Sequence, residues 1–132
     1  ATTVLGVARQ IAEAESCWRE GDAAKAIELL EGTLETEHNL IYTEPPAWMI
    51  PLRHALGAIQ LASGDAAGAE VSYRQDLKKH KENAWSLLGL QQSLTKLGRL
   101  DEAAALKGRV DKAWARADIE PPASCYCGAA LK

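Results

Sequence analysis

The chain has 132 residues, with 15 basic and 18 acidic side chains and a formal net charge of −3. That length suits one domain, and the scattered charges of both signs exclude the broad basic face that nucleic-acid binding requires. No run of about 18 apolar residues offers a membrane span, so we expect neither nucleic acid nor membrane as a partner. Phe is absent, while Ala, Leu, Glu, Lys and Arg are abundant, which favours an all-helical protein.

Six helices are predicted in three antiparallel pairs, each bending at a glycine that permits a left-handed stop. In chain order the pairs cover about residues 4–37, 46–80 and 84–117, and their bends are at Gly21, Gly64 and Gly98. Asp22 and Asp65 follow the first two bends and are expected to cap the next helix.

Residues 38–46 interrupt the pattern and are predicted to be an inserted loop, because they contain Asn39, Thr43 and two prolines. Pro45 and Pro46 suit the entry of the next helix, whereas Pro51 implies that regular helix begins only after it or bends there. Pro121 and Pro122 prevent the last helix from continuing. We therefore expect a helical domain over residues 1–120 and an irregular tail over residues 121–132.

The glycine of each bend stands five residues before an alanine, and the last two bends are 34 residues apart. A fixed period of this length, with two helices in each unit, is typical of a solenoid whose units bury their apolar faces against one another. The predicted fold is therefore an all-α helical-repeat solenoid of about three helix pairs.

The second pair resembles the tetratricopeptide repeat. When Gly64 is placed at position 15 of the repeat, the consensus has large apolar residues at positions 7 and 24, which are Leu56 and Tyr73 here. It has small residues at positions 8 and 20, which are Gly57 and Ala69. The third copy departs at Gln91, where the consensus has a small residue, and at Lys107, where it has a large apolar one. The first copy departs at Gln10 and Glu13, and none of the three has the usual proline at position 32.

Residues 42–48, 53–57 and 124–128 are similar to the carboxyl-terminal part of larger bacterial repeat proteins, a group without an assigned activity. The wider resemblance implies a docking scaffold whose first helices line a concave groove for a peptide or a helix. It places these candidate partner-binding residues on the inner wall: Trp18, Arg19, His54, Trp85, Gln92 and Lys96. The alternative for both tryptophans is packing between neighbouring helices, and for His54 a hydrogen-bonded structural role.

No motif for a nucleophile elbow, a zinc protease or a phosphate loop is present in the sequence, so we expect neither an enzyme nor a bound cofactor. A soft-metal site for copper or zinc, or thiol redox chemistry, is the alternative function, carried by Cys125 and Cys127 on the tail. A disulfide between two cysteines so close in sequence is expected to be strained. The tail could instead fold back over the last helix pair as a cap, remain disordered, or occlude the inner wall.

A third alternative is a structural end cap of a longer array, or a homodimer formed through lateral faces. Three cysteines without an evident disulfide framework favour a reducing, cytoplasmic compartment. Because the first residue is not Met, an upstream segment or a removed signal is compatible with this sequence.

Overall fold

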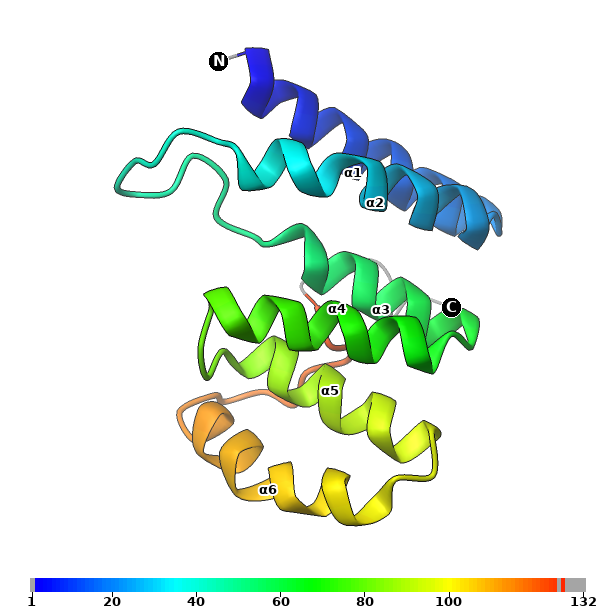
Figure 1. Cartoon of the computed structure of the whole chain (residues 1–132), viewed down its shortest axis with the longest axis vertical. Coiled ribbons are helices and arrows are strands. Elements are labelled where there is room, and N and C mark those ends of the chain that lie inside the picture. Colours follow the sequence, from blue (N-terminus) through cyan, green and yellow to red (C-terminus); the bar gives the residue numbers. More distant parts are fainter. Residues whose placement is uncertain (1, 126, 128–132) are drawn as a thin grey trace.

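The computed structural model describes residues 2–125 and residue 127. Within this part of the chain all regular structure is helical, which confirms the predicted all-α class. The elements are α1 (Thr2–Glu20), α2 (Ala23–His38), α3 (Leu52–Ser63), α4 (Ala66–Lys79), α5 (Ala84–Lys96) and α6 (Leu100–Trp114). Consecutive helices pack against each other, and α3 also contacts α5 directly, so the layers follow one another along the long axis (Figure 1). This arrangement is tetratricopeptide-like.

The three bends within the helix pairs share one hydrogen-bonded geometry. Their glycines have φ of +95° at Gly21, +96° at Gly64 and +75° at Gly98. In each bend the amide after the glycine donates to the carbonyl five residues earlier, at 2.8–2.9 Å. This six-to-one bond satisfies a carbonyl at the end of the first helix. The predicted equivalence of the three bends is confirmed.

The first residues of the second helices also follow the prediction. The Asp22 carboxylate accepts the Lys25 amide at 2.9 Å, and the Asp65 carboxylate accepts the Gly68 amide at 2.8 Å. The third bend has Arg99 instead, whose guanidinium binds Glu70 of α4 and thereby ties two pairs together. The repeated alanine is buried in all three copies, which lets the two helices of each pair approach closely: Ala26, Ala69 and Ala103.

The connection between α2 and α3 is longer than predicted and covers residues 39–51 rather than 38–46. Helix α3 starts only at Leu52 because Pro51 disfavours helical backbone at the residue before it. Pro51 has no side-chain group for capping. The Glu37 carboxylate, from the last turn of α2, instead accepts the Leu52 amide at 2.9 Å. At the other end of the domain, α6 stops at Trp114, before the predicted limit of residue 117.

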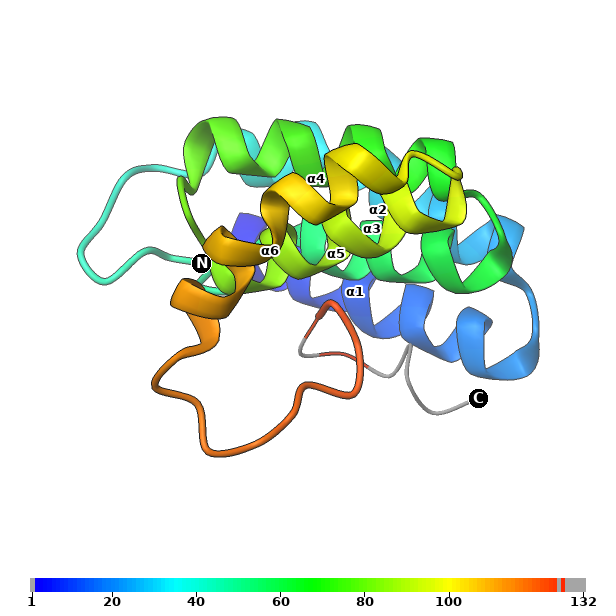
Figure 2. The ribbon, with the colours of Figure 1, turned by 90° about the horizontal axis from the view of Figure 1, so that it is seen from below.

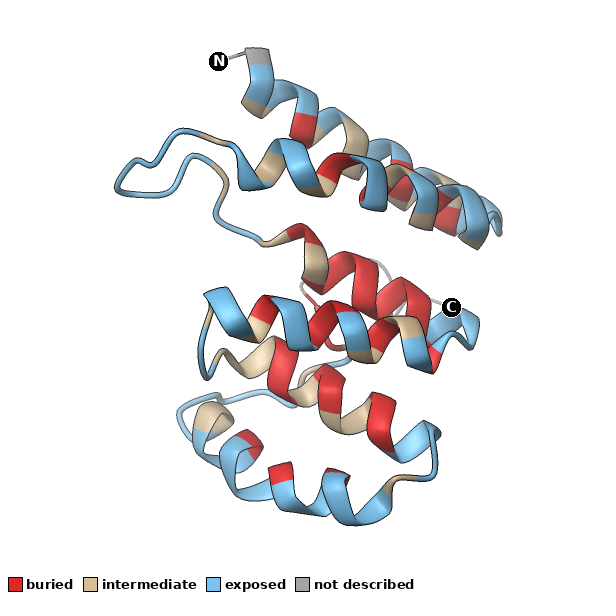
Figure 3. Cartoon of the chain, in the orientation of Figure 1, coloured by how far each residue is buried: buried red, intermediate tan, exposed pale blue. Residues whose placement is uncertain are grey.

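Helix α3 is the centre of the buried core. Nine of its 12 residues are buried, whereas most other helices bury one stripe (Figure 3). One apolar cluster joins α1, α2 and most of α3, and a second joins the end of α3 to α4, α5 and α6. Since α3 contributes to both clusters, neither end of the solenoid has a core of its own.

Tyr73 of α4 lies fully buried between α3 and α5. A Cβ atom added at Gly57 of α3 or at Gly89 of α5 would overlap the Tyr73 ring. The phenol hydroxyl forms a hydrogen bond with the Ser124 hydroxyl, and burial raises the pKa of Tyr73 despite this bond. Two glycines therefore provide the space for one aromatic ring, whose polar end reaches the tail.

The tail lies on the side of the molecule formed by α1, α3 and α5 (Figure 2). Ser124 and Cys125 are 2% and 3% exposed, and Cys125 belongs to the apolar cluster of α1–α3. The expected cap over the last helix pair is therefore wrong in its position, because these buried residues lie across the inner face. Tyr126 lies outside the described residues.

Gly89→Ala should destabilise the fold by about 1–3 kcal/mol, because a new methyl group would force the buried Tyr73 ring or the α5 backbone to move. Gly32→Ala is the matched control, since among the described residues nothing lies within 4 Å of the position its Cβ would take. Replacing a helical glycine at an open site should stabilise by up to about 1 kcal/mol. Urea unfolding followed by circular dichroism measures both, and equal effects would contradict the proposed packing.

Candidate functional site

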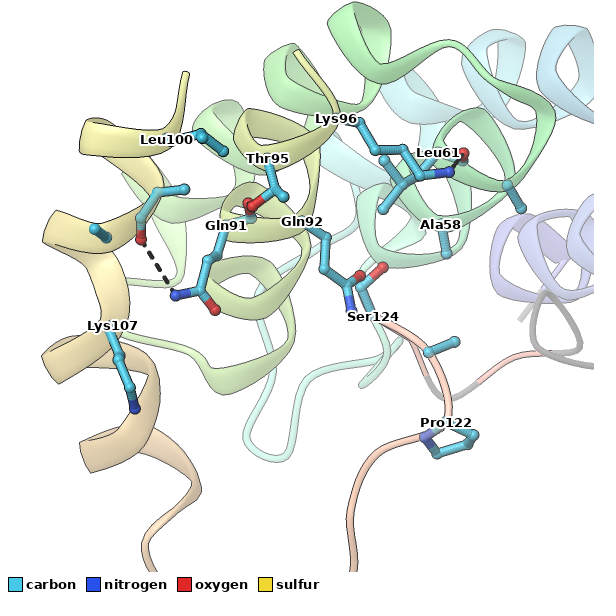
Figure 4. Close-up of a pocket in the computed structure, with 14 residues that line it drawn as sticks. Ala58, Leu61, Gln91, Gln92, Thr95, Lys96, Leu100, Lys107, Pro122 and Ser124 are labelled. Atoms are coloured by element: carbon cyan, nitrogen blue, oxygen red, sulfur yellow. Dashed lines mark hydrogen bonds between the residues drawn. The ribbon is translucent and has the colours of Figure 1, made fainter. Parts of the chain in front are cut away.

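A groove of about 660 Å³ opens on the inner face, between α3, α5, α6 and the tail (Figure 4). Its lining combines small apolar residues with amide, hydroxyl and ammonium groups. The residues that line it are Ala58, Leu61, Ala62, Gln91, Gln92, Thr95, Lys96, Leu100, Ala103, Ala104, Lys107, Pro122, Ala123 and Ser124. The volume falls within the roughly 300–1,000 Å³ typical of ligand sites.

Side chains of α5 hold the walls of this groove at fixed positions. Lys96 Nζ donates to the Leu61 carbonyl of α3 at 3.1 Å, and Gln91 Nε2 donates to the Ala103 carbonyl of α6 at 3.2 Å. Each bond spans two neighbouring helices. The groove therefore has walls that are set before any ligand arrives, which lowers the entropic cost of binding.

The fourth wall of the groove is the tail. Pro122, Ala123 and Ser124 line it, and the bond between Ser124 and Tyr73 fixes them to α4. Figure 4 shows Gln92 extending from α5 toward these tail residues. A ligand in the groove would contact the tail and the repeats together.

Two of the six predicted partner-binding residues, Gln92 and Lys96, line this groove. Trp85 is half-buried, and its ring meets Trp114 of α6 edge to face, with centroids 4.9 Å apart. Trp18 is 3% exposed within the core of α1–α3. For both tryptophans the structure shows the packing contacts of the alternative interpretation.

The other two predicted residues also lie outside the groove. Arg19 is exposed at the end of α1. His54 was expected on the inner wall, but it is 5% exposed, and its Nε2 lies 2.8 Å from Asp76 Oδ2. A buried imidazole held by a buried carboxylate is not available to a ligand on the inner face. Partner binding by Arg19 stays a prediction.

The sequence-based list omitted the residues from α6 and from the tail. Two of the omitted groove residues, Gln91 of α5 and Lys107 of α6, are the positions at which the third copy departs from the repeat consensus. At these two positions the consensus has a small residue and a large apolar residue, which pack between the two helices of a pair, and this chain has polar side chains instead. These departures were the one signal in the sequence that could have located the groove.

A buried carboxylate, Asp76, organises the polar contacts between α3, α4 and α5. Its oxygens lie 2.8 Å from His54 Nε2, 2.8 Å from His80 Nδ1 and 2.6 Å from the Ser86 hydroxyl. Asn83 Nδ2 donates to it at 3.0 Å. Burial raises the pKa of Asp76, but hydrogen bonds from His54 and Ser86 outweigh it and lower the pKa to about 2.

Cys125 and Cys127 are joined in a disulfide. A soft metal ion needs both sulfurs as thiolates, so the predicted copper or zinc site would require the reduced chain. Among residues 2–125 and 127, no group of three or more His, Cys, Asp or Glu side chains is arranged to hold a metal ion.

Comparison with known proteins gives one informative similarity. Over 105 residues, or 80% of this chain, the sequence is 37% identical to cellulose synthase operon protein C of Xanthomonas axonopodis pv. citri (strain 306). The chain spans 6% of the length of that protein. No protein-family model and no solved structure matches the chain. None of the helices that the structure describes is both long and apolar enough to cross a membrane.

Asp76→Asn should lower the free energy of unfolding by about 2–3 kcal/mol near neutral pH, because His54 and Ser86 lose a charged acceptor. The pKa of Asp76 is lower in the folded chain than in the unfolded one, so its contribution is full above about pH 5 and disappears as the pH falls through about 2. The difference in the free energy of unfolding between wild type and variant should therefore become smaller as the pH is lowered. Urea unfolding at several pH values measures this difference.

Asp111→Asn is the control for this experiment, because Asp111 forms an exposed ion pair with Lys107. Its effect should stay within about 0.5 kcal/mol at every pH. If the free energies of unfolding of Asp76→Asn and wild type differed by the same amount over the whole acid range, the assigned role of Asp76 would be contradicted.

Tyr73→Phe should loosen the tail while leaving the helices folded, because it removes the hydroxyl bound to Ser124 and keeps the ring between the two glycines. Hydrogen exchange of the amides of residues 123–125 should become about tenfold faster, and the amides of α3 should change less. Ser124→Ala should have the same local effect. Unchanged exchange in both variants would show that the bond does not hold the tail.

Proposed function

We propose that this chain is a non-catalytic protein-interaction module that binds an extended peptide segment in the inner groove. The observation that carries the proposal is the groove itself, formed by three helices and closed on one side by the tail. Successive helix pairs of a solenoid present their inner faces as one continuous surface, which suits a ligand longer than a single pocket.

The chemistry of the groove fits a peptide. Alanine and leucine side chains offer room for small apolar groups, and the amides of Gln91 and Gln92 can pair with backbone groups of an extended chain. Lys96 adds positive charge, which favours a segment with acidic side chains or a free carboxylate, whereas Lys107 is already paired with Asp111.

The similarity to a cellulose synthase operon protein suggests where the partner is found. We propose that the peptide belongs to a protein of a cellulose-producing assembly, and that this chain contributes one part of a larger scaffold there. This proposal rests on a match that covers most of the chain but a small part of the relative. The predicted cytoplasmic location and the possible homodimer stay predictions.

Leu100→Glu tests the groove, because Leu100 is 62% exposed and lines it. Peptides selected from a display library against the immobilised chain should bind with about micromolar affinity, and Leu100→Glu should weaken them at least about tenfold by adding a negative charge beside an acidic ligand. Fluorescence anisotropy of labelled peptides measures the dissociation constants.

Leu5→Glu is the matched control, since Leu5 is 69% exposed on α1 and does not line the groove. Its affinity for the selected peptides should equal that of the wild type. Equal affinity of Leu100→Glu, or failure to select any peptide, would overturn the assignment of the groove. Cross-linking from residue 100 to a subunit of a cellulose-producing assembly would identify the partner.

A further inference from the structure

The loop over residues 39–51 is the segment that the repeat architecture does not require. Its 13 residues contain neither helix nor strand. Connections of more than about 12 such residues in a compact domain are commonly functional. This loop exposes large apolar side chains, with Ile41 at 84%, Tyr42 at 78% and Met49 at 72% exposure. Because apolar groups in water are unfavourable, a cluster of them on one loop points to a binding role.

A second pocket of about 710 Å³ lies between this loop and the ends of α2, α3 and α4. The described residues that line it differ from those of the inner groove, so it is a separate site. Its loop wall includes the aromatic rings of Tyr42 and Trp48, together with Leu40, Pro46 and Met49. We call it the loop pocket.

The floor of the loop pocket is polar and belongs to the Asp76 network. His54 and His80 line it, and each binds Asp76 through one ring nitrogen, which leaves the other nitrogen outside that bond. Asn83 lines the same floor. Asp76 fixes the orientation of all three side chains. Asn83 already donates to Asp76 and to the His80 carbonyl and accepts the Ser86 amide, so the second ring nitrogens of His54 and His80 are the groups held in place before a ligand binds.

The floor also carries groups of both charges. Lys79 and the Glu37 carboxylate both line the pocket. Burial raises the pKa of Glu37, while the hydrogen bond from the Leu52 amide opposes that effect. A floor with a cation, a carboxylate and neutral donors does not select a ligand of one charge. It suits a neutral ligand that both donates and accepts hydrogen bonds.

The loop wall contains an unsatisfied donor. The indole Nε1 of Trp48 is buried and has no hydrogen-bond partner among the residues that the structure describes. A buried N–H without a partner costs about 1–3 kcal/mol. A ligand hydroxyl that entered beside Trp48 with a small shift of the loop would supply the missing acceptor.

From these features we infer that the loop pocket binds a short oligosaccharide. A pyranose ring has an apolar face of C–H groups, which packs on an aromatic ring, and a rim of hydroxyls, each of which is both donor and acceptor. Tyr42 and Trp48 offer the aromatic surfaces, and His80, Lys79 and Glu37 offer the polar partners. An apolar ligand would leave the floor unpaired, and a simple anion would make no use of the aromatic wall.

This inference is independent of peptide binding in the inner groove. The test is calorimetric titration of the whole chain with three soluble probes, namely tetramers of β-1,4-linked glucose, α-1,4-linked glucose and β-1,4-linked N-acetylglucosamine. At least one should bind with a dissociation constant below about 1 mM. Tyr42→Ala should weaken that binding at least about tenfold, and Trp48→Phe, which keeps a ring but removes the N–H, about three- to tenfold.

Two controls separate this site from other effects. Ile119→Ala removes another exposed apolar side chain outside the loop pocket, and Leu100→Glu alters only the inner groove. Both should bind the saccharide as wild type does, and circular dichroism should show all four variants folded. No heat of binding with any probe at about 10 mM would overturn the inference, and so would binding that Tyr42→Ala and Trp48→Phe leave unchanged.

Discussion

The contact of the Tyr73 ring with α3 and α5 is the constraint on which the middle of this solenoid depends. Gly57 and Gly89 allow the two helices to approach the ring closely. No other residue type would fit at either position without moving the ring. The same side chain reaches Ser124, so the spacing of the layers and the position of the tail are set by one residue. The inner groove has its shape because the tail is held there.

The parts of the fold that follow from short stretches of sequence were predictable. Each bend needs a glycine in the left-handed region and a polar or charged residue after it, and both requirements act within six residues of chain. The resemblance to a known repeat placed Gly57 and Tyr73 at consensus positions, but their contact appears only in the structure. For the start of α3 the sequence offered two positions, an entry at Pro45 and Pro46 or a start after Pro51, and the structure has the second.

The site was predicted less well, because its walls come from residues that are distant in sequence. Ser124 and Tyr73 are 51 positions apart, and nothing local indicates their contact. His54 occupies a repeat position that usually faces a ligand, but here it is buried and bonded to Asp76 of the neighbouring helix. Gln91 and Lys107 looked like imperfections of the repeat. In the structure they line the groove, so departures from a consensus were more informative here than agreement with it.

The hydrogen bond from the Leu52 amide to Glu37 determines which part of the connection between α2 and α3 is needed to start α3. It gives α3 its first capping interaction from the preceding helix, so the intervening segment is not needed to begin α3. Residues 39–50 are therefore not needed to cap α3, although Leu40 and Trp48 among them pack against the apolar cluster of α1–α3. The exposed part of this segment could differ in length and chemistry while the helical frame stays the same. Diversity of recognition among related chains should therefore concentrate at this one insertion.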